Sequence, residues 1–409
     1  MSNNQVQMSG TTFRILIALS CIHCMNDALQ SVISASYPIL KSEMSLTFGQ
    51  IGLIALTYQI AASVFQPVIG LFYDKRPWAW SLPVGMTFTL VGLILLSLSQ
   101  TLPFTLCSVF LVGVGSSTMH PEASRLTSIA AGGRRGLAQS LFQVGGNFGT
   151  SIGPLLVALI VAPHGHQNIA YFAIIACLAI VVMMPVSRWY KKRLTFIKEG
   201  KFAVAGRSEM PLSRKKTIAT ILILLTLIFS KYIYTASLSS YYTFYLIEKF
   251  GVSVQQSQIL LFVFLLATAI GTMIGGPVGD KIGRKYVIWA SILGAAPFTL
   301  LMPHANLLWT VVLSFCVGLI ISSAFPAILV YAQELLPYKL GMVSGLFFGF
   351  AFGVAGVAAA ILGKMADLHG IEAVYRVCAF MPLLGLIAWF LPDLKRIKIN
   401  NSGLLRSSQ

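Results

Sequence analysis

Few residues in this chain could do chemistry inside an apolar environment, and four of them share one helical face. His23, Asp27, Gln30 and Ser34 recur every three or four residues within the apolar stretch 13–37. Apolar surroundings disfavour a charged carboxylate unless a cation pairs with it. The Asp27 carboxyl group is therefore suited to bind and release a proton once in each working cycle of the protein. The alternative is a fixed structural pair between Asp27 and a basic residue.

A second titratable pair lies in the apolar stretch 103–126. His120 and Glu122 flank Pro121, and Arg125 follows within one turn. The two groups can share a water-filled cavity, but residues two apart do not face each other on a helix, so direct contact between them is not assured. The alternative is that Glu122 simply pairs with Arg125. The candidate proton-coupling residues are therefore Asp27, His23, His120 and Glu122.

Lys231 is the most informative single residue because it lies midway along the apolar stretch 217–247. It is too far from either end to reach the membrane surface easily. A charged side chain at this depth is costly, so we expect Lys231 to have a binding partner or a functional role. Tyrosines share its helical face; they are Tyr234, Tyr241 or Tyr242, and Tyr245. An ammonium group beside phenol hydroxyls suits an anionic ligand. The alternative is that Lys231 neutralises Asp27.

Amide side chains supply further binding candidates. Gln139, Gln143 and Asn147 recur every four residues and form one polar stripe. Such amides can bind substrate oxygens, or they can bond to neighbouring helices. Lesser candidates are Tyr58, Gln59, Gln66, Tyr331 and Glu334. The candidate substrate-binding set is Lys231, Tyr234, Tyr241, Tyr242, Gln30, Gln59, Gln139, Gln143, Asn147 and Tyr331.

The elements that position these residues must be membrane-spanning helices. The 409 residues are 56% hydrophobic and 10% charged, whereas a soluble domain carries about 25% charged residues. A span needs about 20 apolar residues and must satisfy its own backbone, so an all-helical bundle is expected. The twelve candidate spans lie near residues 13–37, 48–72, 81–100, 103–126, 136–162, 168–190, 217–247, 256–279, 285–303, 306–333, 340–364 and 371–391.

The net charge of +17 follows this topology. If the N-terminus is cytoplasmic, most Lys and Arg residues fall on the inner side, which predicts that both termini are cytoplasmic. The basic excess therefore indicates membrane orientation and contact with anionic lipid, not nucleic-acid binding. The only long polar insert, 191–216, separates a six-span half at 1–190 from a second at 217–409.

The sequence lacks the residue patterns that several classes of protein require. The six cysteines lie in apolar runs, which argues against a disulfide framework, and the spacing of Cys21 and Cys24 has no second pair beside it. There is no ATP-binding loop, no dinucleotide-binding glycine pattern and no metal-ligand cluster in the sequence. We expect no cofactor, no metal and no enzyme activity.

A charged, glycine-rich turn joins two of the predicted spans and recurs about half a chain length earlier. The later copy comprises Gly276, Asp280, Lys281, Gly283, Arg284 and Lys285, and the earlier copy comprises Gly70, Asp74 and Lys75. The earlier copy then departs, because Pro77 and Trp78 stand where glycine and arginine are expected, which weakens any locking role of that loop. Further matches at the same offset indicate two parallel repeats.

This turn resembles the loop motif of the major facilitator superfamily. The resemblance implies an all-α membrane fold of 12 transmembrane helices in two six-helix pseudo-symmetric halves, which move by alternating access. It also implies that Asp–Arg and Asp–helix contacts hold an inner gate shut. The candidate gating residues are thus Gly70, Asp74, Lys75, Gly276, Asp280, Lys281, Gly283, Arg284 and Lys285.

Other segments resemble one bacterial drug:proton antiporter branch of this superfamily. They include residues 23–27, 119–122, 142–149, 229–232, 239–246 and 331–337. This resemblance implies an inner-membrane exporter of fosmidomycin, a small anionic phosphonate antibiotic, driven by protons. We expect the protein to be a monomer. Two alternatives stay open: a proton symporter importing a sugar phosphate or organic acid, and a membrane enzyme using His120 and Glu122. The sequence offers the membrane enzyme neither an activated nucleophile nor a set of metal ligands.

Overall fold

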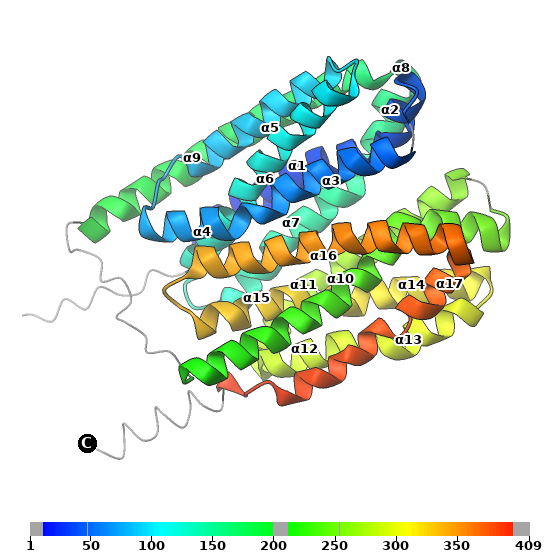
Figure 1. The fold of residues 1–409 in the computed structure, drawn as a ribbon. Coiled ribbons are helices and arrows are strands. Elements are labelled where there is room, and N and C mark those ends of the chain that lie inside the picture. Colours follow the sequence, from blue (N-terminus) through cyan, green and yellow to red (C-terminus); the bar gives the residue numbers. More distant parts are fainter. Residues whose placement is uncertain (1–10, 47, 199–211, 253, 396–409) are drawn as a thin grey trace, which may run out of the picture. The chain divides into compact units, whose positions relative to one another are not determined.

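The computed structural model describes residues 11–46, 48–198, 212–252 and 254–395, and its regular elements in these ranges are all helices (Figure 1). Eleven of the described helical segments are long and apolar enough to cross a membrane. The remaining predicted span corresponds to α5 (Ser81–Ser97), an apolar helix of 17 residues. The prediction of an all-α, multi-pass membrane fold is confirmed.

The chain forms two compact units. Unit 1 comprises Met1–Gly133, Leu141–Gly206 and Lys339–Ile361, and unit 2 comprises Arg134–Ser140, Arg207–Tyr338 and Leu362–Gln409. Two helices, α7 (Arg135–Leu156) and α16 (Leu340–His369), are therefore divided between the units. The predicted linker, 191–216, lies partly outside the described residues, and the division into 1–190 and 217–409 stays a prediction.

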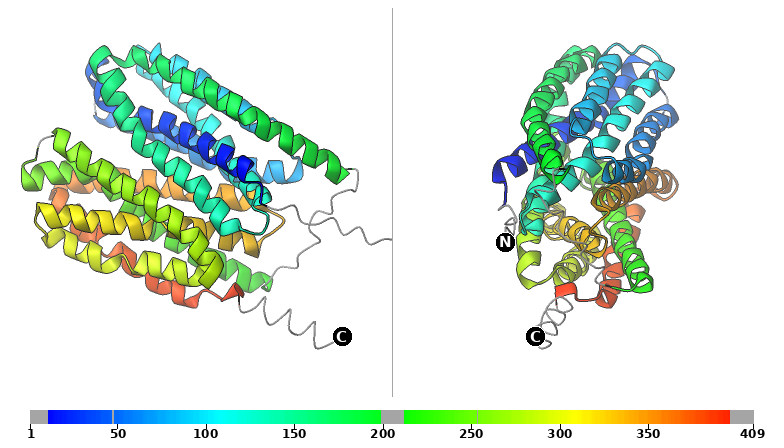
Figure 2. Two further views of the ribbon diagram at one scale, coloured as in Figure 1. Left: turned by 180° about the vertical axis from the view of Figure 1, so that it is seen from behind. Right: turned by 90° about the vertical axis from the view of Figure 1, so that its left-hand side faces the viewer.

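Unit 1 is built around α6, which packs against four other helices of the unit. Its elements besides α5, α7 and α16 are α1 (Phe13–Ala35), α2 (Tyr37–Glu43), α3 (Phe48–Val64), α4 (Gln66–Lys75), α6 (Leu102–Ala130), the π-helical η1 (Val157–Val161), α8 (Ala162–His164), the 3₁₀-helical η2 (His166–Phe172) and α9 (Ala173–Lys198). The partners of α6 are α1, α3, α4 and α5. Helices α5 and α9 run side by side (Figures 1 and 2).

Unit 2 is built around two long helices, α10 (Arg214–Phe250) and α11 (Val254–Ile282). The other elements are α12 (Arg284–Leu293), α13 (Ala296–Leu301), the 3₁₀-helical η3 (Met302–His304), α14 (Leu307–Ile321), α15 (Ala324–Leu335), α17 (Ile371–Cys378) and the 3₁₀-helical η4 (Met381–Phe390). Helix α10 packs against α11, α17 and η4, and α11 packs against α14 and α15.

Several predicted spans are divided into two helices, and proline accounts for the position of the break. Pro67, Pro297 and Pro382 each stand in the first turn of the second helix. Proline lacks a backbone N–H and is tolerated there, whereas inside a helix it removes a hydrogen bond. Pro121 nevertheless lies inside α6 and Pro277 inside α11, so each of these two helices lacks the backbone hydrogen bond that its proline cannot donate.

Two glycines allow α1 and α7 to approach closely. A Cβ atom on Gly145 would lie 2.1 Å from the carbonyl oxygen of Ser20, and one on Gly149 would lie 2.0 Å from that of Cys24. No side chain fits at these distances, so the glycine-rich stretch of α7 serves close helix packing. This packing fixes the face of α1 that carries His23 and Asp27.

Candidate functional site

Helices α1 and α6 bring three of the predicted proton-coupling residues together. His23 Nε2 lies 3.2 Å from Asp27 Oδ2, and His120 Nε2 lies 3.3 Å from Asp27 Oδ1. The exposed fractions of the side chains are 2% for His23, 14% for Asp27 and 0% for His120. We refer to these three residues as the histidine–aspartate cluster. It places one carboxylate between two imidazoles.

Backbone carbonyl groups hold both imidazole rings. His23 Nδ1 donates to the carbonyl oxygen of Phe142 at 2.7 Å, because a carbonyl cannot donate. His23 Nε2, which faces the Asp27 carboxylate, then forms a favourable contact only if a further proton lies between them. His120 Nδ1 lies 3.1 Å from the carbonyl oxygen of Ser116. A role for the cluster in proton coupling stays a prediction.

A chain of polar side chains leads from α3 to this cluster. The Tyr58 hydroxyl donates to Gln30 Oε1 at 2.5 Å, and Gln30 Nε2 donates to Ser116 Oγ at 2.9 Å. Ser116 Oγ lies 3.2 Å from His120 Nδ1. Ser116 was not among the residues that the sequence singled out. Its position four residues before His120, on the same helical face, is the signal that could have identified it.

Aromatic rings surround the cluster. The Phe142 ring stacks on His23 with a centroid distance of 4.0 Å, and the rings of Phe348 and Phe352 lie 5.3 and 5.0 Å from His120. A Cβ atom on Gly146 would lie 2.4 Å from His23 Cε1, so α7 offers no room for a larger residue. These apolar walls strengthen the electrostatic interactions inside the cluster.

The cluster also corrects one expectation from the sequence. We expected no metal-ligand cluster, but His23, Asp27 and His120 each offer one ligand atom, and these atoms lie within 4.8 Å of one another. The sequence could not reveal this group because His120 comes from a different helix. The six cysteines are free, and Cys21 is exposed.

Glu122 does not join the histidine–aspartate cluster. Its carboxylate is fully buried and lies 3.4 Å from Arg125 Nη1, which is the alternative that the sequence left open. Arg125 Nε also donates to Asp74 Oδ1 at 3.1 Å, and Arg125 Nη1 donates to the Tyr190 hydroxyl at 2.6 Å. Residues two apart point to different sides of a helix, so His120 and Glu122 serve separate groups.

Lys231 is buried in unit 2, with an exposed fraction of 6%. Its ammonium nitrogen lies 5.1 Å from the ring centroid of Tyr232 and 5.4 Å from that of Phe325, both cation–π distances. Among the described residues of unit 2, no carboxylate forms an ion pair with it. Burying an ammonium group without an anionic partner is costly. That Lys231 binds an anionic substrate stays a prediction.

The predicted tyrosine partners of Lys231 have other contacts. The Tyr242 hydroxyl lies 2.9 Å from Ser314 Oγ, and the Tyr234 hydroxyl lies 4.0 Å from Met302 Sδ. The Tyr241 hydroxyl lies beside Gly363, where an added Cβ atom would be 2.4 Å from it. The Tyr331 hydroxyl donates to the carbonyl oxygen of Pro392 at 2.5 Å. Their role in substrate binding stays a prediction.

The amide candidates are distributed over several helices. Gln139 and Gln143 are buried in α7, and Gln143 Oε1 has no hydrogen-bond partner among the described residues. Asn147 is half-buried one turn further along α7, and Gln59 is half-buried on α3. Gln66, at the start of α4, donates from Nε2 to the backbone carbonyl oxygen of Ala62 in α3 at 2.5 Å. The Oε1 atom of the buried Gln66 also has no hydrogen-bond partner among the described residues, so both amide oxygens could accept from a donor.

Each copy of the loop motif places an aspartate at the start of another helix. Asp280 accepts the N–H groups of Gly136 and Leu137 at 3.2 and 3.1 Å, at the start of α7. In unit 1, Asp74 accepts those of Gly341 and Met342 at 3.0 and 2.9 Å, at the start of α16. A carboxylate beside a helix N-terminus is stabilised by the helix dipole.

The two copies differ in the origin of the arginine that pairs with the aspartate. Arg284 Nη2 donates to Asp280 Oδ1 at 2.9 Å from within the motif and also pairs with Glu334. Asp74 instead pairs with Arg125 of α6. The earlier copy, in which Trp78 stands at the expected arginine position, therefore still has an Asp–Arg contact. The remaining candidates, Gly70, Lys75, Gly276, Lys281, Gly283 and Lys285, lie in or beside these turns.

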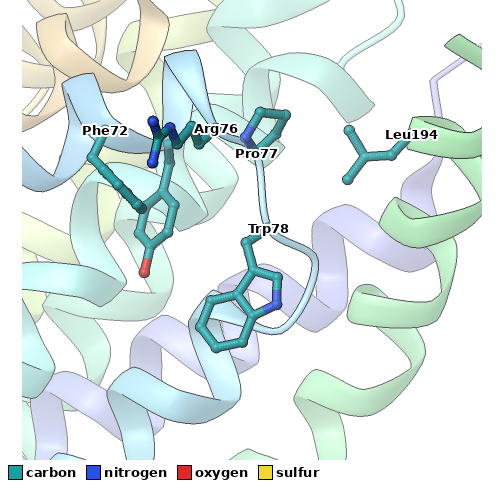
Figure 3. Close-up of a pocket in the computed structure, with 6 residues that line it drawn as sticks. Phe72, Arg76, Pro77, Trp78 and Leu194 are labelled. Atoms are coloured by element: carbon teal, nitrogen blue, oxygen red, sulfur yellow. The ribbon is translucent and has the colours of Figure 1, made fainter. Parts of the chain in front are cut away.

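Two cavities lie near these turns and not at the histidine–aspartate cluster. The larger, about 630 Å³, is lined by Phe72, Tyr73, Arg76, Pro77, Trp78 and Leu194 (Figure 3). It contains none of the predicted substrate-binding residues. A smaller cavity of about 100 Å³ in unit 2 includes Asp280, Arg284, Tyr331 and Glu334.

Similar proteins agree with this architecture. The chain is 59% identical over 383 residues, 94% of each chain, to the "Fosmidomycin resistance protein" of Escherichia coli (strain K12). It is 40% identical over 399 residues, 97% of this chain and 98% of the other, to the "Uncharacterized MFS-type transporter YfnC" of Bacillus subtilis (strain 168).

Solved structures match the fold. A crystal structure of the MFS transporter FucP in the outward conformation superposes with a TM-score of 0.72 at 16% identity, covering 93% of this chain and 98% of that one. The Major Facilitator Superfamily family matches residues 19–246 and 221–405, nearly the whole chain in two overlapping parts. The resemblance noted in the loop motif is thus confirmed, and the chain belongs to the Major Facilitator Superfamily.

Proposed function

We propose that this chain exports fosmidomycin, an anionic phosphonate, across the bacterial inner membrane in exchange for protons. The identity of the drug rests on the similarity to the Escherichia coli protein. The geometric observation that carries the anion preference is Lys231, a buried ammonium without a carboxylate partner in unit 2. In this proposal the chain is a monomer, has both termini in the cytoplasm and catalyses no reaction.

The histidine–aspartate cluster supplies the proton side of the proposal. Asp27 lies between His23 and His120, so a proton can be held at either contact. Moving one elementary charge across the membrane is worth about 2.3 kcal/mol per 100 mV. Expelling an anion from a negative interior while admitting a proton uses this potential in both movements. Glu122 is a secondary candidate because Arg125 already neutralises it.

Drug movement in vesicles tests the proposal. Purified protein is reconstituted into liposomes, a pH gradient is imposed, and fosmidomycin inside the vesicles is measured. We expect the drug to move against the direction of proton flow, and to stop moving when an ionophore removes the gradient. Movement of drug and protons in the same direction would identify an importing symporter instead. Drug movement that is indifferent to the gradient would contradict proton coupling.

A further inference from the structure

We propose that the histidine–aspartate cluster binds one divalent transition-metal ion of the Zn²⁺ or Co²⁺ class. The ligand atoms are His23 Nε2, His120 Nε2 and a carboxylate oxygen of Asp27, all within 4.8 Å of one another. Imidazole nitrogen and carboxylate oxygen are ligands that such ions prefer. The sequence alone did not bring these three residues together, because they come from α1 and α6.

The distances in the cluster fit a single ion. Zn²⁺ binds nitrogen and oxygen ligands at about 2.0–2.2 Å in tetrahedral geometry, which separates neighbouring ligand atoms by about 3.3–3.6 Å. His23 Nε2 and His120 Nε2 lie 3.2 and 3.3 Å from the carboxylate oxygens of Asp27. Three protein ligands leave one position for water, as in sites that keep an open coordination position. Asp27 is the most exposed of the three, at 14%.

The surroundings orient the two imidazoles as metal-binding histidines are usually oriented. His23 Nδ1 is held by the carbonyl oxygen of Phe142, and His120 Nδ1 lies beside the carbonyl oxygen of Ser116. Such contacts fix the tautomer that leaves Nε2 free to bind a metal. The Phe142 ring stacks on His23, and the rings of Phe348 and Phe352 pack against His120. The three ligands are therefore held in place before an ion arrives.

A metal ion would use the same lone pairs that the proposed function assigns to protons. Metal binding requires neutral imidazoles and an ionised carboxylate, so the ion displaces protons from the cluster. It would then hold the cluster in one charge state and stop export. Inhibition of export rests on the proposed function, whereas metal binding itself does not.

Cobalt binding tests the proposal directly. Full-length protein without a polyhistidine tag is purified in detergent and titrated with Co²⁺ alone, and visible absorption is recorded. We expect one saturable binding event per chain with the d–d bands of a low-coordinate ion. Asp27→Asn and His120→Gln should each weaken it about 10-fold or more, as even outer contacts of metal sites do. His304→Gln, at an exposed histidine outside the cluster, should leave it unchanged.

A ligand exchange separates metal binding from a loss of folding. His120→Cys replaces an imidazole with a thiolate, so it should retain one Co²⁺ per chain and add an intense sulfur-to-cobalt band. Absence of a saturable band in the wild-type protein would overturn the proposal. So would a band that persists in Asp27→Asn and His120→Gln, or a His120→Cys spectrum without the thiolate band. Neither drug nor pH gradient is present, so these results are independent of the export test.

Discussion

His120 Nε2 lies 3.3 Å from Asp27 Oδ1, so α6 adds a second histidine to a carboxylate that already has His23 one turn away on α1. Both histidines are at most 2% exposed. A buried charge that loses its partner typically destabilises a protein by about 3–5 kcal/mol. The cluster therefore holds α1 and α6 together, and substitutions must be chosen to separate this structural role from the proposed proton-coupling role.

Asp27→Asn should abolish gradient-driven export while retaining part of the drug binding. The amide keeps the size of the carboxylate, but it cannot take up and release a proton. Fosmidomycin binding in detergent and fosmidomycin movement in vesicles, measured on the same preparation, check this. Export at the wild-type rate by this variant would remove Asp27 from the proton path.

Ser116→Ala should lower the export rate severalfold and shift its pH profile. The serine hydroxyl links Gln30 to His120, and without it His120 Nδ1 loses its side-chain partner. Ser116→Thr keeps the hydroxyl and should retain most of the activity. Ser117→Ala is the matched control, because Ser117 is equally buried but donates only to a backbone carbonyl of its own helix. Equal loss in all three variants would mean that packing, not the hydrogen-bond chain, matters here.

The sequence predicted the membrane spans well, because a bilayer imposes both the length and the apolarity of a helix. Predicted span 13–37 appears as α1, and 103–126 as α6. The sequence did not reveal where spans divide into two helices. A proline is tolerated inside some of these helices, as Pro121 is in α6, and stands just after a break in others, as Pro67 does in the first turn of α4.

The candidate site was predictable only within single helices. The spacing of His23 and Asp27 correctly predicted one face, and the Glu122–Arg125 pair was named as an alternative. Contacts between helices could not be derived from periodicity, so the meeting of His120 with Asp27 was missed. The same limit applies to Lys231, whose neighbours include Phe325 of α15.

Gly146→Ala should destabilise unit 1 and impair export, because a Cβ atom there would lie 2.4 Å from His23 Cε1 and 2.7 Å from Asp27 Oδ2. Forcing a methyl group into a packed site typically costs about 1–3 kcal/mol. Gly353→Ala in α16 is the control, since its Cβ atom would meet only Ser63 Oγ, at 3.9 Å. Thermal unfolding in detergent compares the two. A Gly146→Ala protein as stable as Gly353→Ala would contradict the packing described around the cluster.

Arg125→Gln should destabilise the protein more than Arg284→Gln does. Arg125 pairs with Asp74, which is 8% exposed, and with the fully buried Glu122. Arg284 pairs with Asp280, which is 24% exposed, and with Glu334. Glu334 is 10% exposed, so only the loss of Arg125 leaves a fully buried carboxylate, Glu122, without its cation. Losing the partner of a buried charge typically costs about 3–5 kcal/mol. The order of the two midpoints of thermal unfolding checks this, and the reverse order would refute it.

The anion site at Lys231 is the central claim, and the affinity of purified protein for fosmidomycin tests it most directly. Lys231→Gln should weaken binding about 10-fold or more, because a neutral amide cannot replace a buried cation facing an anion. Lys249→Gln, on the same helix and already bonded to Tyr245 and to the carbonyl oxygen of Pro303, should bind as the wild type does. Equal affinity of the Lys231→Gln and wild-type proteins would contradict the account.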